Sequence, residues 1–244
     1  MRYYKSGIRA LVTGFLFFFC LHGLCSLDLR ITGKELGAGL RGEYNRSFSW
    51  CWDYSTFGAL ELNRRYSFSS GLALGSVERE FEIKIYGSAG LAPLSWIARL
   101  SNLPFKISLA YFYYGLPGMT YNLHAHSVFP SVAFNGKWAG VTLGPNFRFS
   151  NYLGGPPVFE SMLSFLGYVN FINSEKLRIG LSLGNINEYY QGNMGLIFLR
   201  IDSAIRITEQ WSIINGLELF QGGIDGLTTA FYGIAYRGGL RFVW

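Results

Sequence analysis

Residues 230–244 have the sequence A-F-Y-G-I-A-Y-R-G-G-L-R-F-V-W, and this stretch decides how the rest of the chain is interpreted. Alternate positions separate into two sets. Ile234, Tyr236 and Leu240 belong to an apolar and aromatic set, whereas Arg237 and Arg241 belong to a set of small or cationic residues. Because successive side chains of an extended chain point to opposite faces, this period of two predicts a β-strand. One apolar face opposite a face of Gly and Arg is typical of a sheet that separates lipid from water.

The same alternation recurs through the chain, in runs separated by turn and loop residues. In residues 177–184 the odd positions are Leu or Ile, while the even positions are Arg, Gly or Ser. We expect twelve strands, and because the alternation in the first segment is out of step before Leu36, we expect a bulge near Gly33 or a separate short piece there. If the first hairpins are assigned wrongly, ten is the alternative count. The expected strands cover residues 27–44 (with clear alternation from Leu36), 56–63, 66–76, 80–91, 105–114, 127–134, 137–150, 160–172, 177–187, 193–208, 211–221 and 230–244.

The connections between these strands alternate in length. Short turns are expected at residues 63–65, 135–136, 173–176 and 209–210, on the side of the sheet where both ends of the chain lie. An even number of strands brings both ends to one side. Most longer loops, including residues 45–54 and 116–126, are expected on the opposite side. The exception is residues 92–104, where a short helical turn is expected to place Trp96 at the membrane surface.

The composition favours strands in lipid over a soluble domain. The 244 residues are 50% hydrophobic and 18% aromatic, only 15% are charged, and 31 are glycine. Since lipid offers no hydrogen bonds to a sheet edge, a sheet in lipid must close on itself. We therefore predict an all-β fold, a closed antiparallel transmembrane β-barrel, as a single domain over residues 26–244. The alternative is a secreted soluble β-sandwich or lipocalin-like barrel.

The first 25 residues have the layout of a secretory signal peptide. Arg2, Lys5 and Arg9 precede an almost wholly apolar run over residues 10–24, and small residues follow. We expect this segment to be cleaved, with lipid modification of Cys25 as a rival interpretation. Export would leave Cys51 as the only cysteine and exclude an internal disulfide. It would also lower the net charge from +6 to about +3, which, without a basic helix or RNA-binding motif, argues against a nucleic-acid partner.

The end of the last strand carries a short pattern of known meaning. Arg237, Gly239, Phe242 and Trp244 occupy the slots of polar-x-Gly-x-x-aromatic-x-aromatic. In this respect the stretch resembles the C-terminal strand of bacterial outer-membrane β-barrel proteins, over about fifteen residues. The resemblance implies that the barrel-assembly machinery recognises this strand as an assembly signal. It also implies that the protein resides in the cell outer membrane, in contact with outer-membrane lipid.

If the apolar face is outside, the other face lines the lumen and carries charge. Nine cations then face five acids, Glu43, Glu61, Glu82, Asp202 and Glu218, which leaves a positive interior. In one interpretation unpaired arginines line a narrow pore for small hydrophilic, anionic solutes. In the other the charges pair, and side chains such as Tyr86, Phe112, Tyr168 and Phe198 fill a closed barrel with a structural or surface-binding, adhesin-like role. The predicted pore-lining residues are Arg41, Glu82, Lys84, Lys106, Arg148, Arg178, Arg200, Asp202, Arg206, Glu218, Arg237 and Arg241.

The search for catalytic and metal-binding patterns leaves one weak candidate. His124 and His126 share a face of a strand, but no third ligand stands near them in the sequence. His126 and Ser127 resemble the residue types of the outer-membrane phospholipase, but that family's His-x-Ser-Asn-Gly-Arg pattern is missing. We therefore predict a monomeric, porin-like barrel with no enzyme activity, no cofactor and no metal. The closed barrel remains the alternative.

Overall fold

The computed structural model describes residues 31–45, 49–77, 80–97, 100, 102–118, 122–152, 155–186, 197–221 and 231–244. Long strands dominate these residues, since their alternating side chains suit an extended backbone with two different faces. In chain order the strands are β1 (Ile31–Asn45), β2 (Ser49–Leu62), β3 (Tyr66–Val77), β4 (Glu80–Leu91), β5 (Phe105–Leu116), β6 (Leu123–Asn135), β7 (Ala139–Asn151), β8 (Val158–Asn173), β9 (Leu177–Gly184), β10 (Ile197–Arg206), β11 (Trp211–Gln221) and β12 (Phe231–Val243).

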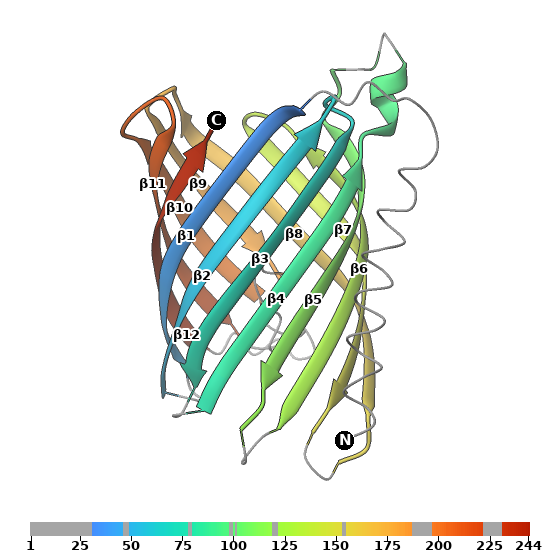
Figure 1. Ribbon diagram of the computed structural model, residues 1–244, viewed down its shortest axis with the longest axis vertical. Helices are drawn as coiled ribbons and strands as arrows, with labels where there is room; N and C mark the ends of the chain where they lie inside the picture. The colour runs from blue at the N-terminus through green and yellow to red at the C-terminus, as the bar shows by residue number, and fades with distance from the viewer. Residues whose placement is uncertain are drawn as a thin grey trace. The chain divides into compact units, whose positions relative to one another are not determined.

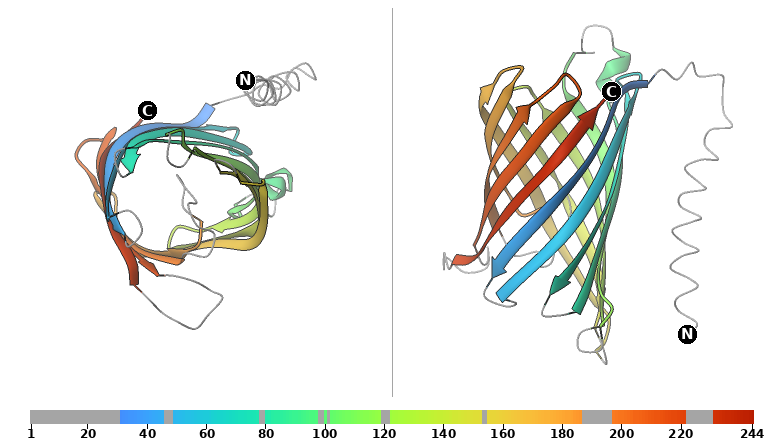
Figure 2. Two further views of the ribbon diagram at one scale, coloured as in Figure 1. Left: turned by 90° about the horizontal axis from the view of Figure 1, so that it is seen from below. Right: turned by 60° about the vertical axis from the view of Figure 1, so that its left-hand side comes forward.

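The twelve strands form a closed antiparallel barrel, as the alternation predicts (Figures 1 and 2). Each strand pairs with its neighbours in sequence, and β12 closes the barrel by pairing with β1, with Leu240 opposite Ala38. Each described strand pairs with two neighbours, so none of them is an edge strand, which is the condition for a sheet in lipid. The twelve-strand count is confirmed, and the alternative count of ten is wrong.

The predicted turns gather at the end of the barrel where β1 begins and β12 ends, which we call the terminal rim (Figure 1). In the turn between β2 and β3, Asn63 and Arg64 adopt positive φ angles of 53° and 56°. The expected bulge is present, because the β1–β2 register shifts between Ile31 and Gly33. A 3-10 helix, η2 (Pro93–Trp96), lies at the same rim, within the residues where a helical turn was expected, and Trp96 is exposed. The opposite end is called the loop rim.

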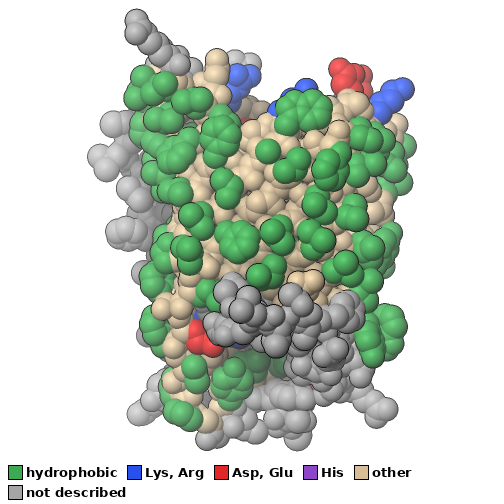
Figure 3. All heavy atoms as spheres, turned by 180° about the vertical axis from the view of Figure 1, so that it is seen from behind, with side chains coloured by type: hydrophobic (Ala, Val, Ile, Leu, Met, Phe, Trp, Pro, Cys, Tyr) green, Lys and Arg blue, Asp and Glu red, His purple; other side chains and the backbone are tan. Residues whose placement is uncertain are grey.

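Apolar side chains are spread over the face of the barrel seen in Figure 3, and exposed large hydrophobic residues occur on each of the twelve strands. Along β10, for example, Ile201 and Ile205 are exposed, whereas Arg200 and Ala204 are buried. A soluble barrel would show the reverse, since water favours charged side chains on its outer face. The outer surface is therefore built for lipid, and charged side chains in this view concentrate at the terminal rim.

Two predicted loops are wrong, because their residues belong to strands. Residues 45–54 were expected to be a loop, but β2 begins at Ser49 and pairs Cys51 with Glu43 of β1 and with Val77 of β3. Trp50 and Trp52 point outward with 73% and 59% of their surface exposed. The alternation is hard to recognise here, because Trp50 and Trp52 on one face and Cys51 on the other are all apolar.

The second corrected loop is residues 116–126. Strand β6 begins at Leu123, so His124 and His126 lie in the sheet rather than in a loop. Both histidines lie opposite β5, which carries several tyrosines, and His126 pairs with Tyr113 in the β5–β6 register. Turn-forming residues upstream made the segment look irregular, but backbone pairing with β5 extends the strand.

The hairpin at Asn135-Gly136 is present, but its turn is longer than predicted. Strand β6 ends at Asn135 and β7 begins at Ala139, so Trp138 lies in the turn and is exposed. The Lys137 Nζ atom lies 5.6 Å from the centroid of the Trp138 ring. Because Trp138 lies in the turn, the alternation of the expected strand over residues 137–150 does not apply to it.

The predicted signal peptide, residues 1–25, lies outside the described residues. Within the part of the chain that the structure describes, no helix is both long and apolar enough to span a membrane.

Candidate functional site

Five charged side chains lie on one row of directly paired residues inside the barrel. Asp53 of β2 is opposite Arg41 of β1, and Arg41 is opposite Arg237 of β12. Glu82 of β4 and Asp202 of β10 stand at the two ends of the row, each separated from it by one glycine. The strand register, which no local pattern contains, thus brings together residues that are far apart in sequence.

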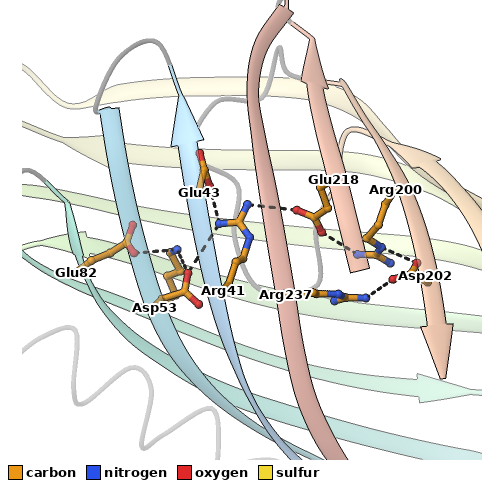
Figure 4. A network of polar contacts seen from close by, with 9 residues as sticks. Arg41, Glu43, Asp53, Glu82, Arg200, Asp202, Glu218 and Arg237 are labelled. Atoms are coloured by element: carbon orange, nitrogen blue, oxygen red, sulfur yellow. Dashed lines mark hydrogen bonds and ion pairs between the residues drawn. The ribbon is translucent and has the colours of Figure 1, made fainter. Parts of the chain in front are cut away.

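Ion pairs join this row to the rows beside it (Figure 4). Arg41 Nη1 lies 2.6 Å from Glu43 Oε2 and 3.8 Å from Asp53 Oδ2, while Arg41 Nη2 lies 3.2 Å from Glu218 Oε2. Arg200 continues the chain of contacts, with Nη1 3.3 Å from Glu218 Oε1. We name this network the ionic belt, and its members are Arg41, Glu43, Asp53, Glu82, Lys84, Arg200, Asp202, Glu218 and Arg237.

The two ends of the ionic belt are also closed by ion pairs. Lys84 Nζ lies 2.8 Å from Asp53 Oδ2 and 2.8 Å from Glu82 Oε2. At the other end, Asp202 Oδ2 lies 2.7 Å from Arg200 Nε, and Asp202 Oδ1 lies 2.7 Å from Arg237 Nη2. Every cation of the belt therefore has at least one carboxylate within reach of a charge-assisted hydrogen bond.

Several belt residues are deeply buried, which decides how they contribute to stability. The Glu218 side chain is 1% exposed, and those of Lys84 and Arg200 are each 5% exposed. Moving an ion out of water is costly, so a buried charge without its partner is strongly unfavourable. The belt therefore has to be complete for its members to stay charged inside the barrel.

A glycine makes room for the ion pair between β10 and β12. Gly216 of β11 is opposite both Asp202 and Arg237. A Cβ atom at this position would lie 2.8 Å from Arg237 Nε and 3.0 Å from Asp202 Oδ1. The missing side chain lets the two charged groups meet across the intervening strand.

Apolar and aromatic side chains occupy the lumen beside the ionic belt. Phe112 stacks on Tyr86 with ring centroids 6.5 Å apart, and only 7% of Phe112 is exposed. Phe198 and Phe220 form a second buried group, and Leu166 packs against both groups. Bulky side chains and paired charges are the two features that the sequence associates with a closed barrel, and both are found in the described lumen.

The predicted pore-lining residues separate into three sets. Seven of them belong to the ionic belt: Arg41, Glu82, Lys84, Arg200, Asp202, Glu218 and Arg237. Two cations stand beside single acids, with Lys106 Nζ 3.6 Å from Glu61 Oε1 and Arg148 Nε 3.8 Å from Glu160 Oε2. The remaining three, Arg178, Arg206 and Arg241, lie near the terminal rim and line one small cavity. Their role in a pore stays a prediction.

The sequence alone suggested a lumen with a net positive charge, and this expectation is wrong for the described residues. Among the described strand residues at inward-facing positions, the nine cations are matched by nine acids. Four of these acids were missing from the predicted set: Glu35, Asp53, Glu80 and Glu160. Asp53 was missed because its segment was assigned to a loop. Glu80 and Glu160 are the first residues of the expected strands 80–91 and 160–172 but were not counted, and Glu35 precedes Leu36, where the clear alternation begins.

The histidines form an outward-facing pair of contacts with tyrosines. Tyr111 Oη lies 2.7 Å from His126 Nδ1, and Tyr113 Oη lies 2.8 Å from His124 Nδ1. Ser127 is buried on the inner face, so its side chain points away from that of His126. Within the described residues, no group of three His, Cys, Asp or Glu side chains is arranged to hold a metal ion.

The predicted assembly-signal residues occupy both faces of β12. Phe242 packs against Trp211 with ring centroids 4.7 Å apart and against Trp244 at 5.2 Å. Arg237 points inward to Asp202, and Gly239 lies where a Cβ atom would be 2.4 Å from the carbonyl oxygen of Ala38. The aromatic pair at the terminal rim fits a membrane-water interface, while Arg237 and Gly239 have structural roles inside the closed barrel.

No family model matches the sequence. No curated protein sequence matches it either. The structure, in contrast, is similar to that of several solved bacterial barrels.

The translocator domain of the autotransporter NalP from Neisseria meningitidis aligns with a TM-score of 0.54 at 11% identity, over 98% of this chain and 97% of that one. The NanC porin aligns with a TM-score of 0.55 at 10% identity, over 84% of this chain and 98% of that one. The KdgM porin in complex with disordered oligogalacturonate aligns with a TM-score of 0.51 at 10% identity, with the same coverage. The protein therefore has the fold of bacterial outer-membrane β-barrels.

Proposed function

We propose that the protein resides in the outer membrane as a monomer and conducts small hydrophilic solutes through a narrow path along the ionic belt. The observation that carries this proposal is a charged network inside a barrel whose outer face is apolar. Stability alone does not explain the network, because well-packed hydrophobic residues often stabilise a core as well as buried ion pairs do. Charged inner walls are the usual lining of a water-filled passage through a barrel.

The ionic belt supports only weak charge selection. Its four cations, Arg41, Lys84, Arg200 and Arg237, face five acids, Glu43, Asp53, Glu82, Asp202 and Glu218. The members that keep the most exposed side-chain surface are of both signs, with Arg237 at 21% and Asp202 at 20%. A solute that passes the belt meets paired charges, so size and hydration should restrict passage more than charge does. Any preference for anions must then arise elsewhere in the lumen.

The fold is compatible with more than one activity. Two of the similar structures are porins and one is an autotransporter translocator, so the architecture does not choose between these roles. In the channel proposal, β12 with Phe242 and Trp244 is the segment that the assembly machinery recognises. The apolar outer surface is then the part in contact with outer-membrane lipid.

A closed barrel with a structural or surface-binding role is the second candidate, and the apolar filling favours it. Phe112, Phe198 and Phe220 are 7%, 3% and 8% exposed although they point into the lumen. An interior packed in this way can block water without any gate. In that case the ionic belt holds the wall together, and the exposed Trp50 and Trp52 near the loop rim would belong to the contact surface.

Single-channel recording in a planar bilayer separates the two candidates. The full chain is expressed, purified in detergent, and checked for the heat-modifiable gel mobility of a folded barrel. Stable conductance steps that change when Asp202 and Arg237 are both replaced by Ala would support the channel. A folded barrel that never conducts, including after substitution of Phe112 by Ala, would contradict it and leave the closed barrel.

A further inference from the structure

Three arginines near the terminal rim form a cluster that the ionic belt does not reach. Arg178 lies on β9, Arg206 on β10 and Arg241 on β12, and all three line one cavity of about 150 Å³. We name them the mouth cluster. The cavity could hold roughly five water molecules, since one water takes about 30 Å³ of liquid volume. That space is also sufficient for a small hydrated anion.

The strand register explains why the three side chains converge. Arg206 is opposite Ser212 of β11, and Ser212 is opposite Arg241, so these three positions form one row. Arg178 is opposite Ala204, which stands one inward position before Arg206 on β10. Ala204 and Ser212 are small and each is 6% exposed. Small side chains beneath long ones leave the cavity between the guanidinium groups.

The mouth cluster lacks the close carboxylates that neutralise the ionic belt. Within the described residues, none of the three arginines has an ion pair shorter than 4.0 Å, although Glu35 attracts Arg241 and Glu175 lines the cavity. Lys176 adds a fourth cation to the lining. Arg178 and Arg206 also repel Arg241. The Nε of Arg241 is buried and has no hydrogen-bond acceptor among the residues that the structure describes. A cluster of like charges with an unsatisfied buried donor is the arrangement that an anion would complete.

We propose that the mouth cluster binds an oxyanion, a free phosphate or the phosphate group of a small solute, inside the barrel at the terminal rim. The guanidinium fork matches the oxygens of phosphate in a bidentate manner, and several such forks around one cavity can surround a tetrahedral anion. Ser212 adds a hydroxyl donor to the same wall. The three arginines, Ala204 and Ser212 occupy inward-facing positions, and the turn between β8 and β9 completes the lining, so the cavity opens at the rim inside the barrel wall. In the proposed channel this site lies at the end formed by the terminal rim, and phosphate binding does not depend on conduction.

Isothermal titration of the folded, detergent-purified full chain with inorganic phosphate tests the site directly. Wild-type protein should bind phosphate, and each of Arg178→Gln, Arg206→Gln and Arg241→Gln should weaken affinity about tenfold, the usual loss for one charge-assisted hydrogen bond. Arg65→Gln is the matched control, because it removes the same charge from a turn at the same rim but does not line the cavity. Its affinity should equal that of the wild type.

Three outcomes would overturn the proposal: no binding by folded wild-type protein at millimolar phosphate, equal loss in Arg65→Gln, or unchanged affinity in the triple Gln variant. Arg178 is exposed, so its single variant should fold even where others do not. Binding of a phosphate monoester with the same dependence on the three arginines would identify a phosphorylated solute, and binding of free phosphate alone would identify the ion; either result supports the site. Phosphate binding without conductance would contradict the channel and retain the site. Conductance without phosphate binding would contradict the site and retain the channel.

Discussion

Arg200 and Arg206 lie on the same strand and face the same lumen, yet their surroundings are opposite. Arg200 is 4% exposed and holds Asp202 and Glu218 at 2.7 and 3.3 Å. Arg206 is exposed and, within the described residues, has no carboxylate within 4.0 Å. The difference shows that an inward-facing arginine is not by itself a binding group. The residues on the neighbouring strands decide whether the arginine forms ion pairs within the barrel wall or is available to bind a ligand.

The largest effect is expected from removing the central acid of the ionic belt. Glu218→Gln keeps the shape of the side chain but leaves Arg41 and Arg200 without their shared carboxylate, which should lower the free energy of unfolding by about 3–5 kcal/mol. Urea unfolding followed by gel mobility measures the loss. Glu175→Gln, an exposed acid in a turn, is the control and should change stability by less than about 0.5 kcal/mol. Equal losses of stability in the Glu218→Gln and Glu175→Gln variants would contradict the distinction between the ionic belt and the terminal rim.

A comparably large effect is expected at the apolar filling. Phe198→Ala removes a buried ring that points inward and should cost about 3 kcal/mol of stability. Any conductance of the barrel should rise, because the ring occupies the lumen. Leu199→Ala, one position along and facing outward, should leave conductance unchanged. If the two variants conduct alike, the apolar group does not restrict the path.

A smaller effect is expected where β11 makes room for the ion pair. Gly216→Ala would bring a Cβ atom 2.8 Å from Arg237 Nε and should destabilise the barrel by about 1–3 kcal/mol through overpacking. Gly42→Ala is the matched control, since its added Cβ would meet no atom within 4 Å. Thermal loss of the folded gel band compares the two variants. An unaffected Gly216→Ala barrel would show that the Asp202–Arg237 contact adapts freely.

The smallest effect on stability should follow from substitution in the mouth cluster. Arg206→Gln should change the free energy of unfolding by no more than about 0.5 kcal/mol, because the side chain is exposed and, among the described residues, has no carboxylate within 4.0 Å. If the barrel conducts, the same variant should lower the permeability of anions relative to cations, which the reversal potential in a salt gradient measures. A large loss of stability would contradict this prediction and show that Arg206, like Arg200, stabilises the barrel wall.

The comparison also shows where sequence patterns were sufficient. The alternation in β9 and β12 predicts strands, and it also predicts the face on which Arg178 and Arg241 lie. The pattern failed at β2 and β6, where Trp50 and Trp52 or a preceding turn-rich segment hid the start of a strand. In both places pairing with a neighbouring strand extends the sheet beyond the residues that alternate clearly.

The sequence by itself determined the barrel class, the twelve strands, the turns at one rim and the direction of most side chains. These properties are local, because an extended backbone sends successive side chains to opposite faces regardless of its partner. Only the tertiary structure decided that Asp53, Arg41, Arg237 and Asp202 share one row and that Arg178, Arg206 and Arg241 surround a cavity. Those neighbours depend on the register between strands and on closure of β12 against β1. A shift of register would leave every strand in place and change every ion pair that joins two strands, such as Arg41–Glu218 and Arg237–Asp202.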